Sequence, residues 1–106
     1  MTDDTMNEES RLLAEQERAR QAQELAEHPL FKEALQQYRE RLMQQWADSP
    51  ARDTEGREKL WLMCKTADAV ERHLVELMQT GKLASLQLEQ RRTLAQRARE
   101  SLRGLW

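Results

Sequence analysis

The chain has 106 residues, of which 39% are hydrophobic and 34% charged, and its formal net charge is -2. This length allows one domain with a modest core, and a composition rich in Glu, Gln, Arg, Ala and Leu but poor in Gly and Pro predicts an all-α fold. No stretch approaches the roughly 18 uncharged apolar residues of a membrane span, and the acidic N-terminus differs from a secretory signal. We therefore expect a cytoplasmic protein with no membrane partner.

The acidic N-terminal segment, residues 1–27, predicts a helix from about residue 7 onward. The segment holds eight acidic and three basic residues, a net charge of -5, and the large apolar residues of its helix are Leu12, Leu13 and Leu25. Helices of such poor amphipathicity are marginal in water. We expect this arm to make few core contacts, and to be either partly disordered or ordered by a partner chain.

Residues 28–81 predict the core of the fold, an antiparallel helical hairpin. Its first helix is expected over residues 29–47, because Pro29 disfavours helical geometry at His28 and suits the first position of a helix. The apolar residues of this helix recur at steps of three and four and share one face. They are Phe31, Leu35, Tyr38, Leu42 and Trp46.

The second helix of the hairpin is expected over residues 54–80, after a loop at residues 48–53 that is rich in turn and cap residues. Gly81 follows the last periodic residue and predicts a C-terminal stop. One face of this helix is again apolar. It carries Leu60, Cys64, Ala67, Val70, Leu74, Leu77 and Met78.

The basic C-terminal segment, residues 82–106, predicts a separate flanking helix over about residues 83–102. It holds six basic and two acidic residues, a net charge of +4. The asymmetry with the N-terminal arm indicates contact between the two ends, within one chain or between chains, or an anionic partner. A hairpin cannot cover its own apolar face, so either this helix folds back or a second copy completes an oligomeric bundle.

The residue pattern gives no support for enzyme chemistry. Cys64 lies in an apolar stripe and behaves there as a small hydrophobic residue, and His28 suits a helix cap. His73 with Glu76 supplies only half of a metal site. We therefore expect no catalytic residues, no metal, no cofactor and no small-molecule substrate.

Three tryptophans beside one Phe and one Tyr indicate a protein interface, because Trp is enriched at interface hot spots. Trp61 either extends the core face or packs on a partner. Trp106 either folds back or anchors the C-terminus in another subunit. The residues expected at a protein interface are Trp46, Trp61, Leu74, Leu77 and Trp106.

The arginines of the C-terminal helix are the candidate contacts to an anionic partner, either nucleic acid or an acidic protein surface. Apart from Trp106, this helix has no aromatic residue to stack on bases. The candidate residues are Arg91, Arg92, Arg97, Arg99 and Arg103.

The run Ser49-Pro50-Ala51-Arg52-Asp53-Thr54-Glu55-Gly56-Arg57-Glu58-Lys59-Leu60-Trp61 and the later run Met78-Gln79-Thr80-Gly81-Lys82-Leu83-Ala84 carry a resemblance. The segment from Trp46 to Ala84, a little over a third of the chain, resembles small helical proteins encoded among the head and packaging genes of tailed bacteriophages and prophages. The resemblance implies a phage context but no reaction and no binding residues.

The expected function is therefore that of a non-enzymatic phage accessory in head morphogenesis or DNA packaging. It would act through helix-mediated oligomerisation and contacts with other phage proteins, in the host cytoplasm or the virion. Two alternatives stay open, a small nucleic-acid-binding regulator that uses the basic C-terminal helix and a phage-encoded inhibitor of a host protein.

Overall fold

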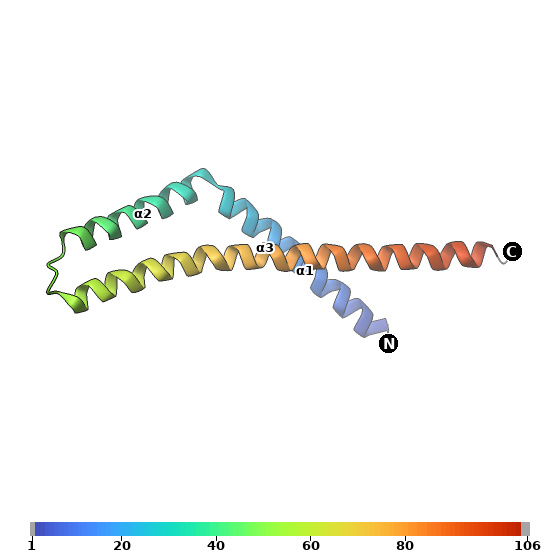
Figure 1. Cartoon of the computed structure of the whole chain (residues 1–106). Coiled ribbons are helices and arrows are strands. Elements are labelled where there is room, and N and C mark those ends of the chain that lie inside the picture. The colour runs from blue at the N-terminus through green and yellow to red at the C-terminus, as the bar shows by residue number, and fades with distance from the viewer. Residues whose placement is uncertain (1, 105–106) are drawn as a thin grey trace. The chain divides into compact units, whose positions relative to one another are not determined.

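The computed structural model describes the backbone of residues 2–104 and the side chains of residues 4–104. Over this range the protein is all-α, as the composition predicted, with three helices (Figure 1). They are α1 (Thr2–Glu27), α2 (Pro29–Asp48) and α3 (Thr54–Arg103). None of these helices is long and apolar enough to cross a membrane. The described residues form two compact units, one of residues 22–76 and one of residues 2–21 with 77–104.

The start of α2 is set by a proline and a histidine cap, as the sequence predicted. Pro29 occupies the first turn, where a missing N–H has no consequence. His28 has extended backbone geometry, and its Nδ1 accepts a hydrogen bond of 3.1 Å from the backbone N–H of Leu30. One of the free N–H groups at the start of the helix is thereby satisfied.

The loop between α2 and α3 is closed by side-chain caps at both ends. The Oγ of Ser49 donates to the carbonyl oxygen of Trp46 at 2.6 Å, which satisfies a free carbonyl at the end of α2. At the start of α3, the Oδ1 of Asp53 accepts from the backbone N–H of Gly56 at 3.0 Å. A carboxylate at this position is also favoured by the helix dipole.

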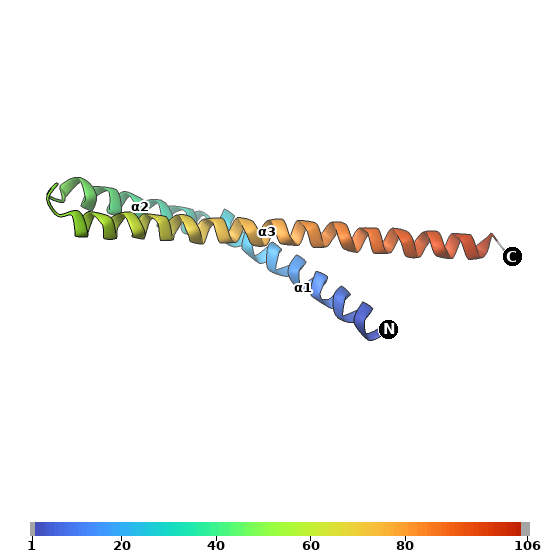
Figure 2. The ribbon, with the colours of Figure 1, turned by 60° about the horizontal axis from the view of Figure 1, so that its bottom comes forward.

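In the unit of residues 22–76, α2 and the first part of α3 form the predicted antiparallel hairpin (Figures 1 and 2). The most buried apolar residues of this unit are Leu42, Ala22 and Ala67, with 2%, 4% and 7% of their surface exposed. Arg39 of α2 forms ion pairs with Asp68 and Glu71 of α3, the first at 3.0 Å. The hairpin therefore has a narrow core, and the ion pairs of Arg39 with Asp68 and Glu71 form an ionic clasp beside it.

The predicted helix stop at Gly81 is wrong, because α3 continues without a break to Arg103. Gly81 is buried, and its φ is negative, so it does not take the left-handed geometry of a C-terminal stop. A Cβ at this position would overlap the Cβ of Ala19 and lie 3.1 Å from the carbonyl oxygen of Glu15. The glycine thus serves a close approach of two helices rather than a turn.

The unit of residues 2–21 and 77–104 is a pair of helical segments, residues 2–21 of α1 and the second part of α3. Leu12 of α1 and Ala84 of α3 are each only 1% exposed. The Nε2 of Gln16 donates to the Oγ of Ser85 at 2.9 Å. These contacts correct the expectation that the N-terminal helix makes few core contacts.

The second part of α3 also does not fold back, so that route to a completed core is excluded. Instead α1 covers one face of it. An ion pair of 2.7 Å between Arg91 and Glu8 lies toward the N-terminal end of α1. Beyond this pair, every described residue of α3 is exposed, from Arg92 to Arg103, and Figures 1 and 2 show the N-terminal end of α1 apart from α3.

We predict that Gly81→Ala lowers the free energy of unfolding, although alanine favours a helix by up to about 1 kcal/mol over glycine. Overpacking a tight contact costs roughly 1–3 kcal/mol, so the clash with Ala19 should outweigh the propensity. Urea unfolding followed by circular dichroism measures the change. Gly104→Ala is a control for an added methyl group without a clash, because Gly104 lies just beyond α3 and a Cβ there would meet no atom closer than 3.6 Å.

A double-mutant cycle with Ala19→Gly isolates the contact from the propensity effects of each change. Ala19→Gly should make Gly81→Ala less harmful than it is in the parent chain. Equal effects of Gly81→Ala in both backgrounds would contradict the close approach.

Candidate interaction surfaces

The first candidate surface is an apolar hollow of about 240 Å³ in the hairpin, next to the loop. Its lining comprises Leu42, Met43, Trp46, Leu60, Trp61 and Cys64. The structure thus brings together two of the predicted interface residues, Trp46 and Trp61, from opposite helices. The exposed fractions of Trp46 and Trp61 are 49% and 57%. Trp46 is therefore outside the closed core, where its place on the apolar stripe of α2 predicted it to lie, and Trp61 is outside that core as well.

Two cations lie over the tryptophans of this tryptophan hollow. The guanidinium carbon of Arg57 is 4.1 Å from the ring centre of Trp46, and the Nζ of Lys65 is 5.5 Å from that of Trp61. Both distances are in the range of cation–π attraction. The hollow therefore combines exposed aromatic surface with positive charge at its edge, a chemistry that suits a protein partner.

A second hollow of the hairpin, of about 310 Å³, contains another predicted interface residue, Leu74. Leu74 is half-buried there beside Phe31 and Leu35 of α2. The hollow also includes Arg39 and Glu71, which are joined by the ionic clasp. The hydrogen bond from Arg39 to Glu71, and after it the one to Asp68, raise the pKa of Arg39, so its guanidinium stays charged.

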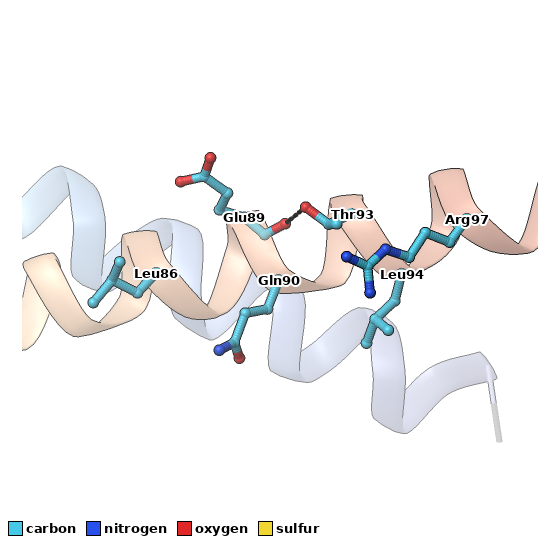
Figure 3. Close-up of a pocket in the computed structure, with 6 residues that line it drawn as sticks. All are labelled: Leu86, Glu89, Gln90, Thr93, Leu94 and Arg97. Atoms are coloured by element: carbon cyan, nitrogen blue, oxygen red, sulfur yellow. Dashed lines mark hydrogen bonds between the residues drawn. The ribbon is translucent and has the colours of Figure 1, made fainter.

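The third candidate surface is a shallow groove along the second part of α3 (Figure 3). Its lining comprises Leu86, Glu89, Gln90, Thr93, Leu94 and Arg97. In Figure 3 the side chains of Gln90 and Leu94 point to the same side of the helix, and Glu89 points to the other side. Leu86 and Leu94 are 57% and 64% exposed. This leucine groove is an apolar surface without cover in the described part of the chain.

The predicted arginines divide among three positions rather than forming one face. Arg91 is half-buried and paired with Glu8, and Arg97 lines the leucine groove. The other three belong together. Arg92, Arg99 and Arg103 share one side of α3 with Gln96 and Glu100, around a hollow of about 370 Å³. This basic face contains three of the five arginines that the sequence singled out.

Of the two remaining predicted interface residues, Leu77 and Trp106, only Leu77 lies among the described residues. Leu77 is half-buried in α3, in the unit that contains α1. Trp106 lies outside the described residues, so the prediction that it anchors the C-terminus stays a prediction.

The residues considered for metal or thiol chemistry are dispersed. Within residues described by the structure, no three His, Cys, Asp or Glu side chains are grouped to hold a metal ion. His73 is exposed, with its Nδ1 3.6 Å from Glu76, and Cys64 is half-buried in the tryptophan hollow. Sequence reasoning missed Met43, Leu86 and Leu94 as surface residues, although Gln90 and Arg97, about one turn before and after Leu94, are a weak signal of an exposed site.

Comparison with known proteins adds no assignment. The chain matches no protein family model, and no curated protein or solved structure is significantly similar to it.

We predict that Arg39→Ala lowers the free energy of unfolding by about 1 kcal/mol, the range for partly exposed ion pairs. Arg39 is 30% exposed and contacts two carboxylates of the opposite helix, so its removal should loosen the hairpin. Urea unfolding measures the loss, which should shrink in high salt as the charges are screened. Arg41→Ala, an exposed neighbour on α2, is the control. Equal stability of the two variants would show that the clasp contributes nothing.

Proposed function

We propose that this protein is a non-enzymatic assembly accessory that works through helix-mediated self-association and contacts with other proteins. The observation that carries the proposal is the leucine groove on α3, which exposes Leu86 and Leu94 on a helix whose other face already packs on α1. Helices with an exposed apolar stripe are covered by further helices in stable architectures.

The tryptophan hollow supports the second part of the proposal. Trp46 and Trp61 expose about half of their surface around an apolar depression, and Met43 beside them is 68% exposed. Large exposed apolar patches on small proteins mark interaction sites more often than they mark chance exposure. The hollow would therefore receive an apolar side chain of a partner protein.

The phage setting of the proposal, head morphogenesis or DNA packaging, rests on the resemblance of residues 46–84 alone. In that setting the partners would be a second copy and other phage proteins.

The test of self-association is the solution mass by light scattering, measured at about 0.1 M and about 1 M salt, where the screening length falls from ~10 Å to ~3 Å. We predict a mass above the 12.6 kDa of one chain at both salt concentrations, since apolar contacts persist when charges are screened. A single-chain mass throughout the micromolar range would refute self-association.

A second candidate function, nucleic-acid binding, is favoured by the basic face of α3. Arg92, Arg99 and Arg103 lie on one side of the helix over three exposed turns, an arrangement that fits phosphates along a groove. The absence of aromatic neighbours among the described residues of this face favours backbone contacts over base stacking.

This candidate predicts that affinity for a labelled DNA duplex falls with added salt, with a log–log slope of about -0.9 for each phosphate contact. Replacing Arg92, Arg99 and Arg103 together by Gln should abolish the binding measured by fluorescence anisotropy. The matched control replaces Arg18, Arg41 and Arg72, which are exposed elsewhere, with the same loss of charge. An equal loss in both triple variants would reject the basic face as a specific site.

A further inference from the structure

The partner that fits the leucine groove is not a second basic segment. The groove includes Arg97 and lies in a segment of net charge +4. Two such segments side by side would repel each other, whereas an acidic helix would be attracted. Any apolar helix that docks there should therefore carry carboxylates beside its apolar side chains.

The chain itself contains a helix of this kind, α1. Its N-terminal part has two large apolar residues with high exposure, Met6 at 63% and Leu13 at 54%. Met6 and Leu13 are seven residues apart, which places them on one side of the helix. Glu9 lies between them at steps of three and four and is also exposed.

Spacing and charge match between this outward face of α1 and the leucine groove. Seven residues span about 10.5 Å along a helix, and the eight residues from Leu86 to Leu94 span about 12 Å. In an antiparallel arrangement, Met6 meets Leu94 and Leu13 meets Leu86. The amide of Gln90 then lies opposite the carboxylate of Glu9, to which it can donate a hydrogen bond.

Neither surface is used by the contact between α1 and α3 within one chain. The residues that line the leucine groove, Leu86, Glu89, Gln90, Thr93, Leu94 and Arg97, all belong to α3. On α1, Met6 lies nine residues before Glu15, whose backbone lies at Gly81, and nine residues are two and a half turns, so Met6 points away from that contact. Both surfaces are therefore open to another copy while the intrachain pair stays intact.

We infer that α1 of a second copy docks antiparallel in the leucine groove, with Met6 and Leu13 beside Leu94 and Leu86. This inference rests on the proposed self-association and names the surfaces that carry it. Each copy then offers two different surfaces, the outward face of its α1 and its own leucine groove. Reciprocal docking would close a two-fold dimer, and docking of each copy onto the next would build a ring or an open chain.

The experiment mixes two single-cysteine proteins, both in a Cys64→Ala background. One carries Met6→Cys and the other Leu94→Cys, so a disulfide between them can form only between copies. Mild oxidation should convert most of the mixture into covalent pairs, several-fold more than a control mixture of Met6→Cys with Leu62→Cys. Leu62 is a suitable control because it is 52% exposed, on α3 in the hairpin unit. The pair Leu13→Cys with Leu86→Cys repeats the test if Met6→Cys unfolds.

The outcomes separate this inference from the proposed function. Selective cross-linking together with a light-scattering mass of two chains or more supports both. An oligomer that cross-links no better than the control overturns the docking of α1 but leaves self-association standing, with another helix or an acidic partner in the groove. A protein with the mass of one chain overturns both.

Discussion

The close approach of α1 to α3 at Gly81 is the contact on which the rest of the account depends. Without a Cβ at Gly81, the two backbones come near enough for Ala19 to rest against α3, and a side chain at that position would meet it directly. The contact fixes the register in which Gln16 reaches Ser85 and Glu8 reaches Arg91. It thereby determines which side of each helix remains outside.

Two packed helices alone cannot bury all of their apolar side chains from solvent. The small inner side chains of this pair, such as Ala19 and Ala84, bring the helices close but bury little surface, and Leu12 is the only large side chain of the described pair to be fully buried. Leucines on the outer faces are therefore left without cover. The hairpin unit shows the same condition at its tryptophans, where the narrow core leaves an open hollow.

Charge acts on this arrangement in two ways. Within one chain, Glu8 pairs with Arg91, and Arg39 pairs with carboxylates of the opposite helix. These ion pairs contribute little free energy, and they orient helices that apolar contacts already hold together. In the proposed docking between copies, the acidic α1 and the basic end of α3 would attract each other, whereas two basic ends would repel. The basic face with Arg92, Arg99 and Arg103 shares no residue with the leucine groove, so the two candidate functions use separate surfaces of α3.

Much of the fold could be predicted from local sequence signals. Pro29 with its histidine cap, the loop with Ser49 and Asp53, and the helical periodicity gave the hairpin, because each depends on neighbours in the chain. Gly81 could not be interpreted in this way. A glycine after an apolar stripe suits both a helix end and a close helix contact, and only the position of Ala19, 62 residues earlier in the sequence, decides between them.

The residue types at the candidate surfaces could be predicted from the sequence, but which of those residues lie together could not. The sequence singled out the tryptophans and arginines by residue type, and the pairing of Trp46 with Trp61 followed only from the hairpin. The separation of Arg91 from the basic face likewise required the position of Glu8. Exposed leucines such as Leu94 were missed because helical periodicity marks a face as apolar without telling whether anything covers it.

The most direct test of the account is an NMR measurement of proximity between the Ala19 methyl group and the Hα protons of Gly81. The account predicts a strong cross-peak between them, together with helical chemical shifts on both sides of Gly81. Absence of the cross-peak, with shifts that mark a helix end at Gly81, would contradict the packing of α1 on α3 and with it the assignment of every outward face.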